Sequence, residues 1–92
     1  MIVRIMGEGQ VELDDAHLPE LDRLDDDLLD EMESGDDEGF RRTLTALLDA
    51  VRRLGTPLPD DALEPSGLIL PSPDATLEEV RDLLGDGGLI PS

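Results

Sequence analysis

The sequence lacks several residue types on which much protein chemistry depends. It has no cysteine, which excludes disulfides, thiolate zinc sites and cysteine nucleophiles together. It also has no tryptophan or tyrosine, and Phe40 is its only aromatic residue. No segment reaches the roughly 18–20 apolar residues that a membrane-spanning helix needs, and residues 1–6 are too short for the apolar region of a signal peptide. We therefore expect a soluble, intracellular protein with an aliphatic core.

Lysine is absent as well, and acidic residues dominate the charge. The chain has 24 aspartates and glutamates against seven basic residues, all arginine, for a formal net charge of −17. A salt-loving or GC-rich host would explain this bias, because surface carboxylates keep a protein hydrated. The surplus of negative charge opposes direct binding to nucleic acid, because such binding requires clustered basic residues. It also opposes binding to an anionic membrane leaflet. Four of the seven arginines nevertheless lie in residues 40–54, which indicates a surface for a partner rather than a catalytic centre.

The length of 92 residues predicts a single domain, residues 1–92, that begins with a β-hairpin. Residues 1–6 and 10–13 flank Gly7-Glu8-Gly9, and two glycines in a short connection supply the positive φ that a tight turn demands. Alternation places Val3, Ile5, Val11 and Leu13 on one face. It places Arg4 and Glu12 on the other face, where the two can pair across the strands.

Helical spacing of apolar residues follows the hairpin. One stripe runs over residues 18–32 and ends at Ser34-Gly35, and a second runs over residues 40–54 and ends at Gly55. Asp36 or Asp37 is the candidate N-cap of the second helix. Because the connection is short, the two helices should form an antiparallel hairpin.

The rest of the chain, residues 56–92, contains shorter predicted elements. Residues 56–67 form a proline-rich loop without periodicity, and residues 68–70 form a short buried strand. Thr76 and Glu79 match a capping box at the start of a helix over residues 77–84, and residues 89–91 form an apolar patch that docks onto the domain. The predicted fold class is α+β: an N-terminal β-hairpin, an antiparallel helical hairpin, a short third strand and a C-terminal helix.

No constellation of residues supports catalysis, a cofactor or a metal site. His17 is the only histidine, and no second histidine or cysteine accompanies it as a ligand. The run at residues 25–27 lies mid-helix, so its carboxylates point in three directions and cannot form a calcium loop. The glycine clusters lack the phosphate-binding motif, and the serines lack a base. We expect a protein that is not an enzyme.

Two polar features of the predicted helical hairpin suggest specific roles. Asp25 falls inside the apolar arc of the first helix, where a buried carboxylate must be paired or hydrogen-bonded; alternatively it lies at the open end of the interface and stays hydrated. On the second helix, Arg41 and Arg52 lie on one shoulder of the polar side, and Arg42 and Arg53 lie on the other. The arginines can neutralise the eight carboxylates of residues 20–33; alternatively, one shoulder does so and the other stays free for a partner. Arg42 and Arg53 are the favoured contact pair, since they lie within about 20° of each other and three turns apart on a helix.

The chain also resembles the PspA-associated domain family, PspAA, nearly from end to end. The resemblance rests on IVRI at 2–5, GEGQ at 7–10, LD at 24–25, Phe40 with Leu44, Leu47 and Leu48, VR at 51–52, LGTPLP at 54–59, LILP at 68–71, DATLEEV at 74–80 and GLIP at 88–91. The sequence departs from the pattern at Val11, where we expect an aromatic residue, and at Gly67, where we expect aspartate.

The resemblance implies a non-enzymatic module linked to PspA-type proteins, the membrane-remodelling coiled coils of the phage-shock envelope-stress response. It implies an adaptor that binds a PspA-type coiled coil in the cytoplasm and is recruited through it to the inner face of the membrane. It implies no cofactor. The alternative function is an acidic decoy that mimics nucleic acid and occupies a basic partner. A decoy needs carboxylates along one continuous face, whereas here an arginine-bearing helix interrupts them.

Overall fold

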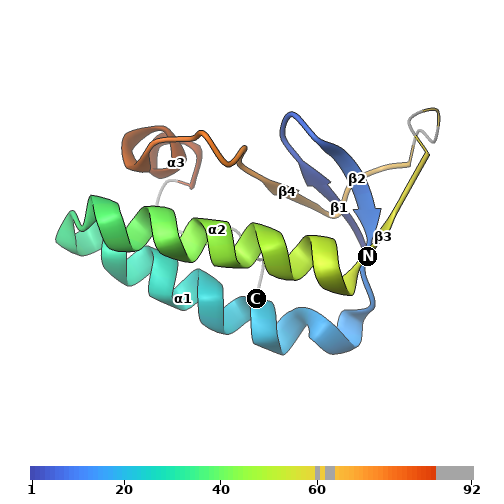
Figure 1. Ribbon diagram of the computed structural model, residues 1–92, viewed down its shortest axis with the longest axis horizontal. Helices are drawn as coiled ribbons and strands as arrows, with labels where there is room; N and C mark the ends of the chain where they lie inside the picture. The colour runs from blue at the N-terminus through green and yellow to red at the C-terminus, as the bar shows by residue number, and fades with distance from the viewer. Residues whose placement is uncertain (60, 62–63, 85–92) are drawn as a thin grey trace.

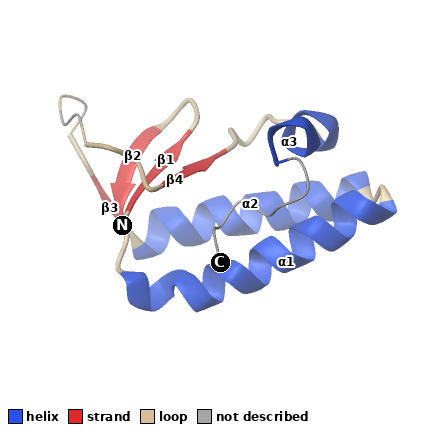
Figure 2. Cartoon of the chain, turned by 180° about the vertical axis from the view of Figure 1, so that it is seen from behind, coloured by secondary structure: helices blue, strands red, loops and turns tan. Residues whose placement is uncertain are grey.

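The structure is a computed structural model that describes residues 1–59, 61 and 64–84. Two long antiparallel helices, α1 (Leu18–Ser34) and α2 (Asp37–Leu54), form one layer. A four-stranded sheet and helix α3 (Leu77–Leu84) lie on the α2 side of this layer, the sheet at one end and α3 at the other (Figures 1 and 2). The fold is α+β, as the sequence predicts.

The N-terminal hairpin consists of β1 (Ile2–Ile5) and β2 (Gly9–Glu12). Its turn needs both glycines, since Gly7 has a φ of 87° and Gly9 a φ of 122°. Val3 pairs with Val11, and both are buried. The same register places Arg4 opposite Gln10 and Glu12 opposite Ile2, so the prediction of a direct Arg4–Glu12 pair is wrong.

Two further strands extend the hairpin into a sheet of order β3-β2-β1-β4. Strand β4 (Leu68–Leu70) is the predicted short strand, and it pairs parallel to β1. Strand β3 (Thr56–Pro57) pairs antiparallel to β2. The prediction that residues 56–67 are all loop is therefore wrong at its first two positions. A two-residue strand carries no detectable periodicity, and proline is tolerated because β3 lies at the sheet edge.

Local signals fix the ends of the helices. A short 3₁₀ helix, η1 (Asp15–His17), leads into α1, and Asp14 caps it by accepting a hydrogen bond from the Ala16 N–H at 3.0 Å. Helix α1 ends at Gly35, whose φ is 73°, in the left-handed region that glycine favours. The Asp36 carboxylate then accepts from the Gly39 N–H at 3.0 Å and caps α2. The chain therefore turns sharply between the two helices, which pack antiparallel as predicted.

One aliphatic core joins the sheet to the helices. Its fully buried residues come from both layers, and they are Val3, Ile5, Leu13, Leu21, Leu28, Phe40, Leu44, Leu47, Leu48, Val51, Leu70 and Val80. The capping box of α3 forms as predicted, with the Glu79 N–H donating to the Thr76 hydroxyl at 3.2 Å. The predicted apolar patch at residues 89–91 lies outside the described residues.

Candidate functional site

The exposed side of α2 is the candidate interaction surface, because its other side is buried in the core. All four arginines proposed from the sequence lie on this exposed side. We call Arg41, Arg42, Arg52 and Arg53 together the arginine side of α2. The structure gives the four different surroundings, and these decide which of them remain accessible to a partner.

Arg52 joins α2 to the turn of the β-hairpin. Its Nε donates to Glu8 Oε1 at 2.9 Å, its Nη2 donates to the other oxygen of the same carboxylate, and its Nη1 donates to Asp49 Oδ1 at 2.7 Å. The hydrogen bonds from Arg52, with its positive charge, lower the pKa of Glu8, and the bonds to Glu8 and then Asp49 raise the pKa of Arg52. Arg52 is therefore already bonded bidentately to Glu8 and by a single bond to Asp49.

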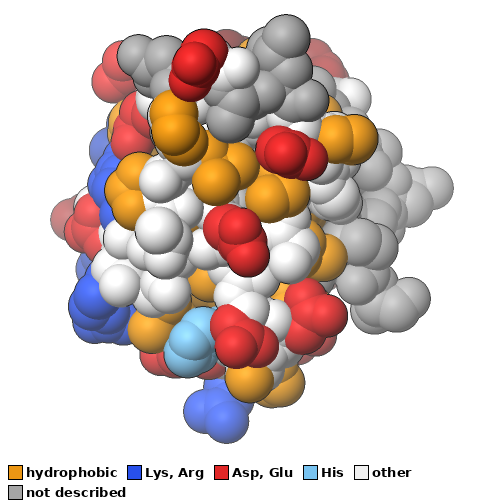
Figure 3. All heavy atoms as spheres, turned by 90° about the vertical axis from the view of Figure 1, so that its right-hand side faces the viewer, with side chains coloured by type: hydrophobic (Ala, Val, Ile, Leu, Met, Phe, Trp, Pro, Cys, Tyr) orange, Lys and Arg blue, Asp and Glu red, His pale blue; other side chains and the backbone are white. Residues whose placement is uncertain are grey.

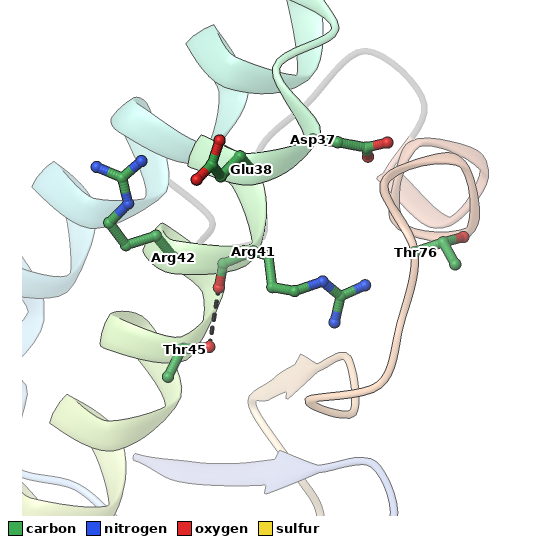
Figure 4. A pocket seen from close by; sticks show the side chains of 6 residues that line it. All are labelled: Asp37, Glu38, Arg41, Arg42, Thr45 and Thr76. Atoms are coloured by element: carbon green, nitrogen blue, oxygen red, sulfur yellow. Dashed lines mark hydrogen bonds between the residues drawn. The ribbon is translucent and has the colours of Figure 1, made fainter.

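Arg41 lies on the same shoulder and points toward the segment that precedes α3 (Figure 4). Its Nη1 donates to the Pro73 carbonyl at 3.4 Å, a long bond. Arg41 lines a cavity of about 670 Å³ together with Asp37, Glu38, Arg42, Thr45 and Thr76. This cavity has two cationic and two anionic side chains, so its charges balance.

Arg42 and Arg53 form the other shoulder, which lies beside α1. Arg53 Nη2 is 4.0 Å from Glu20 Oε1 on α1, and the Arg53 side chain is 71% exposed. Arg42 is exposed and makes no ion pair with any residue that the structure describes. From the sequence, these arginines could neutralise the first helix. At Arg53 the contact with that helix is long and exposed, which makes it weak.

Asp25 lies in the buried stripe of α1 with Leu21, Leu28 and Met32. Its residue surface is 4% exposed, so the carboxylate does not lie at a hydrated open end of the interface. Its neighbours Asp26 and Asp27 are exposed, because consecutive helical residues point in different directions.

Several polar contacts could not be found from the sequence. The Thr43 hydroxyl of α2 donates to Glu31 Oε1 of α1, and Arg81 Nη2 of α3 donates to the Met32 carbonyl near the end of α1 at 2.6 Å. These contacts join elements that are 12 and 49 residues apart. No local pattern signals such pairs; for Arg81, the only available hint is a lone arginine at the centre of a short amphipathic helix.

The described residues offer little for metal or membrane chemistry. Among them, no group of three or more histidine, aspartate or glutamate side chains is arranged to hold a metal ion. His17 lies at the start of α1 and is partly buried. No described helix is both long enough and apolar enough to cross a bilayer. What the arginine side of α2 can do is bond carboxylates, since each guanidinium presents a planar fork of donors.

Comparison with known protein families gives a match over the whole chain. The model of the family described as PspA-associated protein matches residues 1–92. The chain belongs to the PspAA family. No curated protein and no solved structure matches it significantly. Family membership links the chain to PspA in an accessory role. The match covers the whole sequence.

Val11 and Gly67, where the resemblance led us to expect other residues, both lie in or beside the sheet. Val11 is 8% exposed and belongs to the core. Gly67 is exposed, and its N–H donates to the Ile2 carbonyl at 2.8 Å as the chain enters β4. Val11 therefore packs in the core beneath the sheet, and Gly67 bonds to the backbone of β1.

Proposed function

We propose that this PspAA chain is a non-enzymatic adaptor that binds a PspA-type coiled coil through the arginine side of α2. Arg42 and Arg53 make the primary contact, and Arg41 and Arg52 flank it. In this proposal the adaptor works in the cytoplasm and reaches the inner face of the membrane through its partner, within an envelope-stress system. The observation that carries the proposal is the exposure of Arg42 and Arg53 on a chain with 17 surplus negative charges.

The geometry of these two arginines suits a facing helix. They are 11 positions apart on a regular helix, which separates them by about 16 Å along the axis at 1.5 Å per residue and by about 20° around it. A neighbouring coiled coil with an acidic stripe can meet both guanidinium groups at once. Bidentate bonds to its carboxylates would fix register as well as attraction.

Isothermal titration calorimetry of the chain with the PspA-type protein of the same host tests this proposal. Neutralising both arginines, Arg42→Gln with Arg53→Gln, should raise Kd about 10- to 30-fold. This follows because each exposed charged contact contributes roughly 1 kcal/mol to binding and two such contacts are lost. Reversing both, Arg42→Glu with Arg53→Glu, should weaken the complex further. Arg23→Glu on the exposed side of α1 is the matched control, because it also lowers the net charge by two.

The control separates a specific contact from general electrostatics. If Arg23→Glu weakens binding as much as the neutralised pair, only net charge matters and the proposed surface is wrong. If neither double variant at Arg42 and Arg53 changes binding, the contact lies elsewhere, with the acidic exposed side of α1 as the next candidate. If the wild-type chain does not bind the PspA-type protein but displaces nucleic acid from a basic protein, the acidic decoy function replaces the adaptor.

A further inference from the structure

A second cavity, of about 430 Å³, lies between the turn of the β-hairpin and the chain that continues from β3. Figure 3 shows the sheet end of the molecule, where apolar side chains gather among scattered acidic ones and arginines lie at the margin. Arg4 of β1 and Arg52 of α2 contribute the cationic groups of the cavity, and Glu8 contributes an anionic one. Pro57, Leu58 and Pro59 form an apolar wall. We call this cavity the hairpin cleft.

Gln10 holds the hairpin cleft in shape. Its carbonyl accepts from the Leu58 N–H at 3.0 Å, which fixes the segment leaving β3. Its side-chain Nε2 donates to the Glu64 carbonyl at 2.6 Å and to the Ser66 hydroxyl at 2.8 Å, which fixes the segment returning to β4. Gln10 itself is 9% exposed. The wall of the cleft is therefore tied to the sheet at Leu58, and Gln10 is itself held in place by Glu64 and Ser66, as expected of a preformed binding site.

The charge of the cleft differs from that of the molecule. Arg52 is engaged by Glu8, whereas Arg4 is exposed and makes no ion pair with the described residues. Among the described residues that line the cleft, two arginines and one glutamate give a formal charge of +1, whereas the whole chain has a net charge of −17. The cavity beside Arg41 is balanced, and the cavity lined by Glu12, Asp14 and Asp15 is acidic. An anionic group is therefore attracted to the hairpin cleft rather than to those neighbours.

We propose that the hairpin cleft binds a partner-protein segment that carries a carboxylate side chain beside aliphatic residues. The carboxylate bonds the guanidinium of Arg4, and the aliphatic side chains pack on Pro57, Leu58 and Pro59. A second copy of this chain is a poor occupant, because two copies of net charge −17 repel each other. A small inorganic anion would leave the apolar wall uncovered. This site shares Arg52 with the arginine side of α2 but not Arg42 or Arg53, the primary contact there, and it does not depend on the proposed adaptor function.

Amide chemical shifts of the ¹⁵N-labelled chain test the proposal with two capped tripeptides, acetyl-Leu-Glu-Leu-amide and acetyl-Leu-Gln-Leu-amide. The glutamate peptide should cause saturable shifts at Gly9, Gln10 and Leu58 in the millimolar range. The glutamine peptide should bind at least about tenfold more weakly, since it lacks the charge that the cleft selects. Inorganic phosphate should cause no saturable shift at Leu58.

Matched variants complete the test. Arg4→Gln should abolish the shifts while its circular dichroism melt stays cooperative, and Arg23→Gln, with the same net charge, should retain them. The proposal is overturned if the two peptides bind equally, if Arg4→Gln binds as the wild type does, or if the shifts are absent or fall on α2 away from Arg52. Dimerisation of the unliganded chain through this cleft would overturn it as well.

Discussion

Replacing Gly55 with alanine should destabilise the fold, because the end of α2 packs directly against β2. A Cβ atom on Gly55 would lie 2.2 Å from Val11 Cγ1, 2.9 Å from the Val51 carbonyl oxygen and 3.1 Å from the Glu12 carbonyl oxygen. Two of these neighbours are backbone atoms, and Val11 is buried, so none of them can move freely. The backbone of Gly55 is extended, with a φ of −94°, so the cost comes from this overlap and not from the conformation.

The size of the effect follows from overpacking. Inserting a methyl group into a filled site costs roughly 1–3 kcal/mol, after the small backbone-entropy gain that alanine brings to the unfolded chain. For a domain of this size, each kcal/mol corresponds to a fall in Tm of about 4–8 °C. Urea unfolding followed by circular dichroism should show a lower midpoint with an unchanged slope.

Gly67→Ala is the matched control for this prediction. A Cβ there would lie 3.4 Å from Met1 Cγ, an ordinary contact, and 3.8 Å from the Ile2 carbonyl oxygen. Gly67→Ala should leave the midpoint unchanged or raise it slightly. In a double-mutant cycle, Gly55→Ala should cost less in a Val11→Ala background than in the wild type, because the overlap with Val11 Cγ1 is then gone. Equal midpoints for the two single variants would refute the close packing of α2 on β2.

Three further predictions concern polar groups and charge. Asp25→Ala should lower the free energy of unfolding by about 1–3 kcal/mol, since it removes a buried carboxylate and orphans the groups that bond it; an unchanged urea midpoint would contradict this. Added NaCl should raise Tm, because salt screens repulsion within a chain of net charge −17 over about 10 Å at 0.1 M; a falling Tm would show that ion pairs dominate. Because the pKa of Glu8 is lowered in the folded state, its bond to Arg52 stabilises the fold fully above the ordinary glutamate range and is lost as pH falls through the lowered pKa. The Tm difference between wild type and Glu8→Gln should therefore shrink as pH falls, and a constant difference would argue against that bond.

The helices and turns could be predicted because their signals are local. The turn glycines, the glycine at the end of α1, the cap at Asp36 and the Thr76–Glu79 capping box each lie within a few residues of the structure that they specify. The helical periodicity of apolar residues predicts which side of each helix is buried, and Asp25 lies on the buried side of α1.

The sheet edges and the surroundings of the arginines could not be predicted in the same way. Strand β4 pairs with β1 across more than 60 residues, and Arg52 meets Glu8 across 44. A helical wheel places Arg52 and Arg53 on different shoulders but does not indicate which shoulder faces the hairpin. The spacing of Arg42 and Arg53 on a helix already favours that pair in the sequence, whereas the bonds from Arg52 to Glu8 could not be predicted.

The most direct test of the adaptor account is a map of the contact surface. Amide chemical shifts of the ¹⁵N-labelled chain would be recorded before and after addition of the PspA-type coiled coil. The account predicts that the largest changes fall on the exposed side of α2 around Arg42, Asp49 and Arg53, and that they vanish for Arg42→Glu with Arg53→Glu. Changes confined to the exposed side of α1, or no changes at saturating partner, would contradict it.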